Sequence, residues 1–203
     1  MILTVTHANR VAERQALRAM FEARKQVFVD LLKWDVPVIA GRYELDQFDD
    51  VHATYLIVTD PARRHLASAR LLDTRRPTLL DIVFGGLCDR PPPRGEDVRE
   101  ITRFCLSRGI GSSLRRTARD RLVTALALHA LDSGIGCYTG VAEPGWYRQI
   151  FGFGWDCRPL GPFRRAGAQT LGAFAIAIDQ DTPRRLQRAG VLQTDMLSGA
   201  QAA

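Results

Sequence analysis

Arg24 occupies a position where an unpaired guanidinium would be costly to bury. Leu17, Phe21, Arg24 and Phe28 follow one another at helical spacings, so all four side chains share one face of a predicted helix. Burying a guanidinium alone costs roughly several kcal/mol, so this position needs a carboxylate or a polar cleft. The alternative is a side chain at the edge of the apolar stripe whose charged end reaches solvent.

Arg70 lies in a second segment that is otherwise apolar. In residues 64 to 72, apolar side chains fall on both faces of a predicted strand. Such a strand is typical of the centre of a sheet covered on both sides, where an arginine needs an acidic partner. Asp46, Asp49 and Glu100 are the candidate partners. A structural ion pair explains such a group as readily as catalysis does.

Glu100 and Arg103 share a β-rich run that covers residues 98 to 107. Residues three apart in a regular strand point to opposite faces of the sheet. If both side chains serve one site, the strand must carry a β-bulge or a splay that redirects one of them. We predict such an irregularity.

The elements that must position these residues alternate between helices and strands. We expect strands at 2–6, 52–59, 64–72, 98–107, 135–141 and 170–178, and helices at 11–29, 78–88, 112–132 and 145–151. Ser112 or Ser113 is expected to cap the third helix, and a long loop fills residues 33 to 50. This order predicts an α/β fold, a three-layer α/β/α sandwich with a mixed central sheet.

Length and composition favour one soluble domain. With 203 residues, of which 46% are hydrophobic and 25% charged, the chain can form one core. We place that domain at residues 1–178 and a polar, loosely attached tail at 179–203. No apolar run approaches the about 18 residues of a membrane helix, and no export signal precedes the first strand. We therefore expect a cytoplasmic protein that does not associate with a membrane.

The four cysteines are widely spaced and form no CxxC pair. Paired metal-ligand spacing is missing, so we expect no metal site, and a disulfide framework is unexpected in a chain of this length. Small hydrophobic packing is the role that remains for most of these side chains.

The net charge of +6 favours an acidic partner. Within the predicted helix at 112–132, Arg115, Arg116 and Arg119 lie away from the stripe of Leu114, Ala118 and Leu122, so they should face solvent. The sequence carries no helix-turn-helix, zinc-finger or aromatic RNA-binding motif, which argues against nucleic acid as the partner.

Five segments, in order and spacing, resemble the acyl-homoserine-lactone (autoinducer) synthases. They are residues 24–29 (RKQVFV), Trp34, residues 44–49 (ELDQFD), residues 67–72 (ASARLL) and residues 100–104 (EITRF). The similarity extends over about residues 15 to 178. Any one segment would be weak evidence, whereas five in sequence are specific.

The resemblance implies a fold, an activity and a set of site residues. The family's fold is similar to that of the GNAT N-acyltransferases. Its members acylate the amine of S-adenosylmethionine with an acyl thioester, usually on acyl carrier protein but with acyl-CoA as an alternative, and then form the lactone. S-adenosylmethionine is a substrate, so no cofactor is expected. The signature positions fall on Arg24, Phe28, Trp34, Asp46, Asp49, Arg70, Glu100 and Arg103, and Phe104 in the last segment is a further candidate for binding substrate.

This chemistry suggests roles for individual residues. Glu100 is the candidate base that takes the amine proton, directly or through one water, and Arg103 is a candidate donor to the oxyanion. Phe28 and Trp34 are candidates to face the sulfonium or the adenine, and packing in the core is the more common role of such side chains. Arg24 is a candidate to hold a carboxylate.

The acyl chain requires an apolar slot, for which the predicted strand at 135–141 is the candidate wall. Thr139 would contact the third carbon of the chain, with Trp146 nearby. Gly136 and Gly140 would leave room for a longer chain, unless they reflect turn or bulge geometry. An acidic carrier protein would dock on the arginines of the helix at 112–132, and an ordinary solvated helix face explains these arginines equally well.

One rival interpretation is a GNAT-type acyltransferase that uses acyl-CoA on another amine. Residues 108–112 (RGIGS) partly match a pyrophosphate-binding turn before a helix, although Ser113 stands where a small Gly or Ala is usual.

Overall fold

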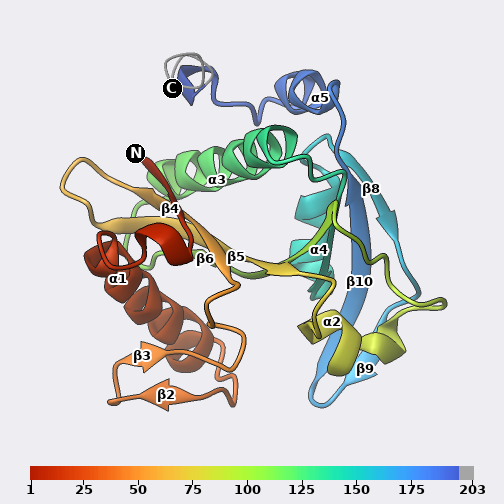
Figure 1. The fold of residues 1–203 in the computed structure, drawn as a ribbon, viewed down its shortest axis with the longest axis horizontal. Coiled ribbons are helices and arrows are strands. Elements are labelled where there is room, and N and C mark those ends of the chain that lie inside the picture. Colours follow the sequence, from red (N-terminus) through yellow and green to blue (C-terminus); the bar gives the residue numbers. More distant parts are fainter. Residues whose placement is uncertain (197–203) are drawn as a thin grey trace. The chain divides into compact units, whose positions relative to one another are not determined.

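The computed structural model describes residues 1–196, which group into two compact units (Figure 1). The first unit contains residues 1–71 and 103–122, and the second contains residues 72–102 and 123–196. Strands β5 and β6 and helix α3 each begin in one unit and end in the other.

The first unit is built on an antiparallel sheet. Its elements are β1 (Ile2–Val5), a 3₁₀ turn (His7–Asn9), α1 (Arg14–Arg24), a π-helix (Lys25–Leu31), β2 (Val38–Ile39), β3 (Tyr43–Glu44), β4 (Thr54–Thr59) and most of β5 (His65–Asp73). Strand β4 pairs antiparallel with both β1 and β5, and β2 and β3 form a separate hairpin. Every residue of β5 except the last is buried, as the sequence predicted for a strand covered on both faces.

Helix α1 begins at Arg14, three residues later than predicted, and continues after Arg24 as a π-helix. Residues Lys25–Leu31 form a π-helix, in which the amide of Leu32 donates to the carbonyl of Val27. Single π turns inside helices are frequent at functional sites. The buried face carries Leu17, Phe21, Arg24 and Phe28, which confirms the predicted stripe.

The second unit contains both parallel and antiparallel strand pairs. Its strands are the first part of β6 (Val98–Leu106), β7 (Cys137–Ala142), β8 (Asp156–Pro159), β9 (Arg164–Ala166) and β10 (Gln169–Ala177). Strands β6 and β7 are parallel, whereas β10 pairs antiparallel with β7, β8 and β9. The helices are α2 (Leu79–Ile82), a 3₁₀ turn (Gly85–Leu87), α3 (Ser112–Asp132), α4 (Pro144–Phe151), α5 (Thr182–Arg188) and a 3₁₀ turn (Thr194–Met196).

The two faces of β7 meet different elements. The Tyr138 hydroxyl donates to the carbonyl of Leu126 in α3, so this residue points to the α3 side. Val141 packs against the cluster that contains Leu80 and Leu87, which come from α2 and the following turn. Because alternate residues of a strand share a face, Thr139 points to the α2 side.

Three expectations about helices need correction. The segment at 78–88 is a four-residue helix followed by a 3₁₀ turn, not one helix. Helix α3 already includes Ser112 and Ser113, so neither serine precedes the helix as a cap. Leu114 is 44% exposed and lies outside the buried stripe, which Ala118, Leu122 and Ala125 do share.

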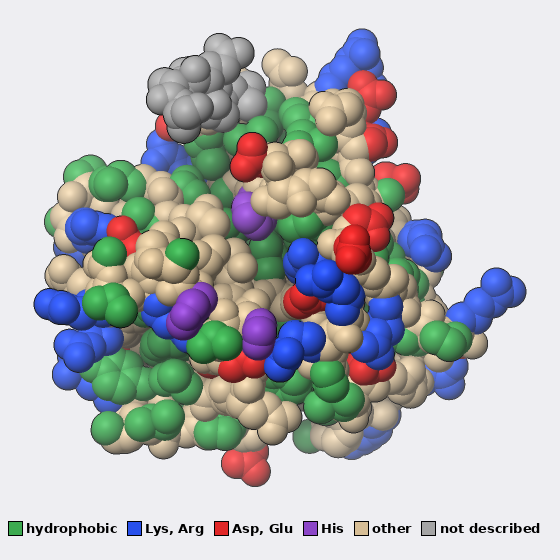
Figure 2. All heavy atoms as spheres, viewed as in Figure 1, with side chains coloured by type: hydrophobic (Ala, Val, Ile, Leu, Met, Phe, Trp, Pro, Cys, Tyr) green, Lys and Arg blue, Asp and Glu red, His purple; other side chains and the backbone are tan. Residues whose placement is uncertain are grey.

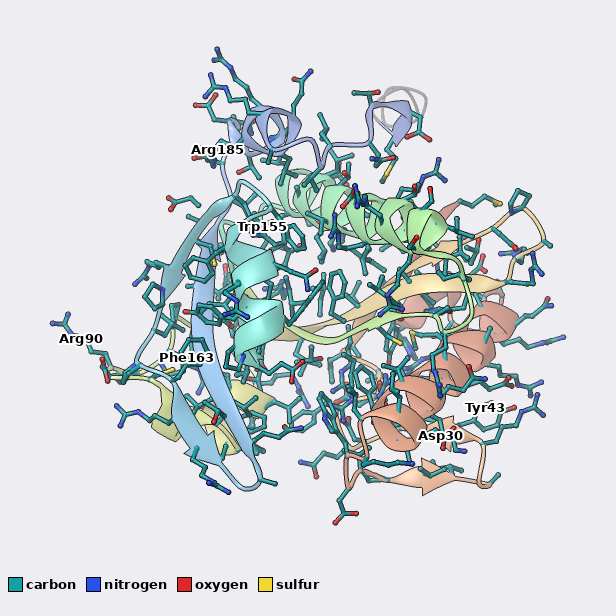
Figure 3. All side chains as sticks on the ribbon, turned by 180° about the vertical axis from the view of Figure 1, so that it is seen from behind. Asp30, Tyr43, Arg90, Trp155, Phe163 and Arg185 are labelled. Carbon is teal, nitrogen blue, oxygen red and sulfur yellow. The ribbon has the colours of Figure 1, made fainter. Side chains whose placement is uncertain are left out.

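For residues 179–196 the prediction of a loosely attached tail is wrong, and residues 197–203 of the predicted tail lie outside the described residues. Leu186 of α5 is fully buried, Val191 is buried beyond it, and the amide of Gln193 donates to the Thr124 hydroxyl. Arg185 (Figure 3) bonds Asp179 at 2.7 Å and so ties α5 to the end of β10. No clear period-2 or helical pattern in the sequence marks β8, β9 or α5.

Two surface properties bear on the expected partners. Among residues 1–196, the helices are all too short or too polar to cross a bilayer. On the face in Figure 2, basic side chains are interspersed with acidic ones. The charge of this face is therefore mixed.

Candidate active site

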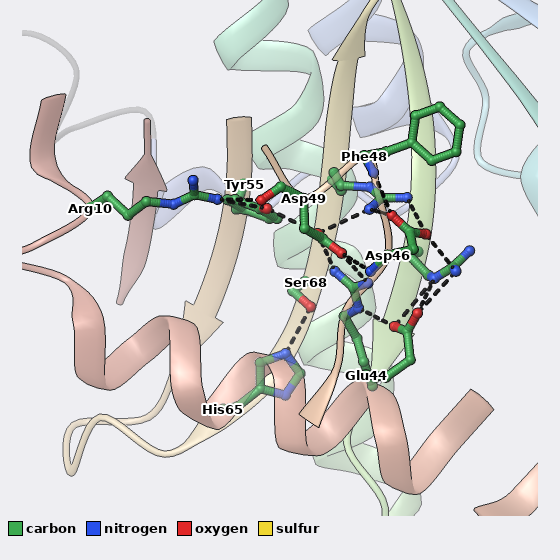
Figure 4. Close-up of polar contacts among 11 residues, drawn as sticks. Arg10, Glu44, Asp46, Phe48, Asp49, Tyr55, His65 and Ser68 are labelled. Atoms are coloured by element: carbon green, nitrogen blue, oxygen red, sulfur yellow. Dashed lines mark hydrogen bonds and ion pairs between the residues drawn. The ribbon is translucent and has the colours of Figure 1, made fainter. Parts of the chain in front are cut away.

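Asp49 is the centre of a buried ion-pair network in the first unit (Figure 4). Its side chain is 1% exposed and accepts two hydrogen bonds from Arg24, at 2.8 and 2.9 Å. Arg70 approaches the same carboxylate at 2.9 Å, and the Tyr55 hydroxyl donates to it at 2.9 Å. Asp49 thus fixes two guanidinium groups from different elements, α1 and β5.

Glu44 and Asp46 complete the network around Arg103. The Nη2 atom of Arg103 lies 2.9 Å from Glu44 and 2.8 Å from Asp46. Arg24 also donates through Nε to Glu44, and Arg70 donates to Asp46 at 2.6 Å. Three arginines therefore meet three carboxylates, and their formal charges cancel.

The pairing changes the acid–base properties of the buried groups. Burial alone would raise the pKa of Asp49, but the ion pairs with Arg24 and Arg70 outweigh it and hold that pKa far below its ordinary value. Burial, followed by the charge of Asp49, raises the pKa of Tyr55 above its ordinary range. Both groups therefore keep one protonation state at neutral pH, a carboxylate and a neutral phenol.

The predicted carboxylate partners of Arg24 and Arg70 are confirmed in part. Asp46 and Asp49 do pair with Arg70, and Arg24 is paired and not extended into solvent. All three nitrogens of Arg24 are used by Glu44 and Asp49. The role of Arg24 in holding a substrate carboxylate stays a prediction.

Arg103 shows the irregularity predicted for its strand. Its φ is 51°, a left-handed conformation rare in a residue other than glycine. Its guanidinium lies over the rings of Phe28 and Trp34, at 5.6 and 5.8 Å, and these rings stack at 4.7 Å. Its Nη1 atom has no hydrogen-bond partner among residues 1–196. Arg103 therefore occupies the cation position over the aromatic pair and keeps one donor group.

Sequence reasoning missed three members of this network. Glu44 stands in the motif two residues before Asp46, so a third carboxylate next to the two named ones is the signal that could have included it. Arg10 donates to the Asp49 carbonyl and the Tyr55 hydroxyl, both at 3.1 Å. Nothing in the local sequence marks Arg10 or Tyr55. Phe104, which follows Arg103, is half-buried.

His65, to which the sequence assigned no role, is buried between two serines. The Ser107 hydroxyl donates its single proton to the His65 carbonyl, so the Nδ1 atom, 2.7 Å away, must be the donor in that contact. The Nε2 atom then accepts from Ser68 at 2.9 Å. Burial lowers the pKa of His65 to about 4, so the ring is neutral at physiological pH.

Glu100 belongs to the second unit and is held differently. Its side chain is buried, with 1% of the residue exposed, and both carboxylate oxygens accept from the amide of Leu80, at 3.1 and 3.0 Å. Glu100 lies directly opposite Thr139 in the parallel β6–β7 pair, and Thr139 is also 1% exposed. The structure thus places the candidate base beside the candidate contact for the acyl chain. Trp146 lies on α4, in edge contact with Phe153.

The space expected at two glycines is already filled. A Cβ atom on Gly140 would lie 2.7 Å from the ring of Phe174, the residue opposite it in β10. One on Gly136 would lie 3.1 Å from the Asp97 carboxylate. These glycines make room for neighbouring side chains, so they do not indicate a longer acyl chain.

The arginines of α3 differ in how far they are available to a partner. Arg116 is exposed. Arg115 is exposed as well, but it donates to the carbonyls of Leu106 and Ser107, at 3.3 and 3.0 Å. The prediction that Arg119 faces solvent is wrong, because its side chain is 24% exposed and pairs with Asp120.

Comparison with known proteins decides the family. The model of the autoinducer synthases matches residues 8–144, which is more than half of the chain. This chain belongs to the autoinducer synthase family. An acyl-homoserine-lactone synthase from Ralstonia nicotianae is 32% identical to this synthase over 171 residues, 81% of the chain and 83% of the relative. The predicted acyl-homoserine-lactone synthase, an acyltransferase, is confirmed.

Solved structures agree on the fold of the synthase. MesI, a CoA-dependent acyl-homoserine-lactone synthase, superposes with a TM-score of 0.84 at 26% identity, covering 95% of this chain and 96% of MesI. A protein from Lactobacillus plantarum assigned as an N-acetyltransferase reaches 0.55 at 16% identity, covering 88% of this chain and 98% of its own, which is a likeness of fold alone. The GNAT-like α/β fold with mixed strand pairing is therefore confirmed.

The substitution Asp49→Asn tests the network of the synthase. It leaves Arg24 and Arg70 short of one buried charge, so we expect the free energy of unfolding at pH 7 to fall by about 3–5 kcal/mol. The parent's advantage should be complete above roughly pH 4 and should shrink as the pH falls, because the folded-state pKa of Asp49 lies below its unfolded value.

Urea unfolding between pH 7 and pH 3 measures this difference. Asp35→Asn is the matched control, because Asp35 lies in the same unit and is exposed. Two results would contradict the central role of Asp49 in the network. One is an equal loss of unfolding free energy in both variants, and the other is a difference between parent and Asp49→Asn that does not decrease at low pH.

Proposed function

We propose that the synthase transfers an acyl group from a pantetheine thioester to the amine of S-adenosylmethionine and then closes the lactone. The observation that carries this proposal is the buried Glu100 carboxylate beside Thr139 on the α2-covered face of β6 and β7. A carboxylate in an apolar environment next to a thioester is suited to accept the proton that the amine must lose.

The first step makes an amide and breaks a thioester. The deprotonated amine nitrogen attacks the thioester carbonyl carbon, and the carbon–sulfur bond then breaks and releases a thiolate. Glu100 accepts the proton lost by the amine, directly or through one water. The Nη1 atom of Arg103, which the network leaves available, is the donor we assign to a developing oxyanion or to a substrate carboxylate.

The second step is intramolecular. A carboxylate oxygen of the acylated substrate attacks the carbon next to the sulfonium, whose carbon–sulfur bond breaks to release neutral methylthioadenosine. The enzyme mainly needs to hold a folded conformer, because a preorganised intramolecular attack gains several kcal/mol, up to about 7–11. The guanidinium of Arg103 already lies over the rings of Phe28 and Trp34, which supports a role of this pair in binding positive charge.

Acyl-CoA is the acyl donor that we propose. Support comes from MesI, which resembles this chain along nearly all of both chains and is CoA-dependent. An acyl carrier protein carries the same pantetheine thioester and remains the alternative, which the exposed Arg116 favours. Both donors and S-adenosylmethionine are cytoplasmic, so we place the enzyme in the cytoplasm.

Product stoichiometry tests the activity. Purified protein supplied with S-adenosylmethionine and an acyl-CoA should release one methylthioadenosine for each free thiol, measured by chromatography and a thiol reagent. Thiol release without methylthioadenosine would mean a simple N-acyltransferase and would end the lactone proposal.

The substitution Glu100→Gln tests the base. The amide oxygen of glutamine can still accept from the Leu80 amide, so the fold should persist, as circular dichroism and thermal unfolding would show. We expect kcat to fall by about 10²–10⁴-fold, the usual range for loss of a general base. Near-normal turnover at saturating substrates would remove Glu100 from this role.

The substitution Arg116→Glu separates the two donors. If a carrier protein docks on the exposed start of α3, kcat/KM should fall for acyl carrier protein and not for acyl-pantetheine, and added salt should reproduce the loss in the parent. Arg188→Glu, on the exposed side of α5, is the matched control. Unchanged kinetics with the carrier would place its docking surface elsewhere.

A further inference from the structure

The second unit carries a groove that none of the candidate site residues lines. Its volume is about 1020 Å³, and its walls come from the loop at 89–93, from helix α4 and from residues 158–163. All three segments belong to the second unit. Small-molecule sites have volumes of roughly 300–1,000 Å³, so the groove is large enough to hold a ligand.

Backbone contacts hold the walls of this groove in place. The amide of Leu160 donates to the Ala173 carbonyl of β10, and the Leu160 carbonyl accepts from the amide of Asp89, both at 2.9 Å. A Cβ atom on Gly161 would clash with the Leu87 carbonyl, so the two chain segments approach as closely as a glycine allows. The groove is therefore already formed in the unit and does not have to open for a ligand.

Three aromatic rings cover one side of the groove. Tyr147 stacks on Phe151 with the ring centroids 4.6 Å apart, and Phe163 meets Tyr147 edge-on at 4.8 Å. Phe163 is nevertheless 44% exposed. Because Tyr147 and Phe151 already use one ring face on each other, the groove offers apolar area more than free ring faces, and prolines of the two loops extend that area. Such a lining suits a flexible alkyl chain.

The charges along the groove are not balanced. Asp89 pairs with Arg164 at 2.8 Å. Arg90 and Arg158 are exposed, and neither forms an ion pair with any of residues 1–196. Arg90 extends from the rim into solvent (Figure 3). Two cations are thus available at the groove while its carboxylate is already paired, which fits an anionic ligand.

The aromatic rings lie on the opposite face of the sheet from Thr139. Tyr138 points to the α3 side, and Gly140, two residues later in β7, shares that face. The ring of Phe174 lies over Gly140, and its centroid is 5.9 Å from that of Tyr147. Thr139 points to the α2 side, so an alkyl chain held on these rings does not occupy the slot proposed for the acyl group.

We propose that this groove binds a long-chain fatty-acid carboxylate. The alkyl chain packs on the rings of Tyr147, Phe151 and Phe163 and on the prolines, and the carboxylate pairs with Arg158 or with Arg90. No bond is made or broken. The inference goes beyond the acyl transfer proposed above and does not depend on it, because binding to the groove needs no turnover.

Titration calorimetry of the whole protein with dodecanoate, kept below its micelle concentration, tests the site. We expect saturable binding with a stoichiometry close to one. Hexanoate, which has the same charge and a shorter chain, should bind more than about tenfold more weakly, since two buried methylene groups already correspond to about tenfold. Dodecyltrimethylammonium, which has the same chain and the opposite charge, should also bind more weakly. Dodecanoate that does not saturate, or equal binding of the ammonium ion, would overturn the proposal.

Two substitutions locate the bound dodecanoate. Arg158→Gln should weaken binding by about 2–5-fold, as expected for an exposed ion pair, and added salt should reduce the difference from the parent. Phe163→Ser should weaken it further, because the ring contact is lost. Arg165→Gln is the matched control, since Arg165 is an exposed arginine of β9 outside the groove and donates to the Gly167 carbonyl. Equal affinities of Arg158→Gln and Arg165→Gln would overturn the proposal even if Phe163→Ser does not fold.

Steady-state kinetics separates this groove from the binding site of the acyl donor. Arg158→Gln should leave KM for acyl-CoA unchanged while dodecanoate binding falls. An equal loss of affinity for dodecanoate and for acyl-CoA would assign the groove to the donor and overturn a separate site. A protein that binds dodecanoate as expected but releases no methylthioadenosine would contradict the proposed reaction alone.

Discussion

The first unit depends on the neutralisation of three buried guanidinium groups. Arg24, Arg70 and Arg103 are between 0% and 9% exposed at their side chains, and each would destabilise the fold if unpaired. Three carboxylates from the segment between α1 and β4 supply the compensating charge. Little of that segment forms strand pairs. Its conformation therefore depends mainly on the ion pairs between its carboxylates and the three arginines.

The buried carboxylate of the second unit is held by other means. Main-chain N–H donation keeps Glu100 in place, whereas Asp49 is fixed by two guanidinium groups and a phenol. A bidentate ion pair with a guanidinium is a stronger contact than a hydrogen bond from a neutral amide. The two buried carboxylates are therefore held by contacts of different kinds, charged donors for Asp49 and a neutral amide donor for Glu100.

Much of this arrangement could be predicted from the sequence, because burial and periodicity are local signals. The apolar stripe around Arg24 and the two-sided burial of β5 required acidic partners, and two of the three were named in advance. Glu44 was not, since which carboxylate pairs with which arginine depends on how β3 lies against α1. Leu114 and the segment after residue 179 were misjudged for the same reason. Periodicity marks an apolar face but does not say which part of that face another element covers. The space expected beside Gly136 and Gly140 is filled by the side chains of Asp97 and Phe174.

Arg103 shows how the network shapes the reactive groups. A left-handed backbone at a residue other than glycine costs about 1–3 kcal/mol, and such strain persists only where the surroundings over-determine it. Here Glu44, Asp46 and the stacked pair of Phe28 and Trp34 all contact one guanidinium. These contacts offset the strain and leave Nη1 as the remaining donor. The direction of that donor is therefore a consequence of the whole ion-pair network, and a change at Glu44 or Asp46 would move it without touching any substrate.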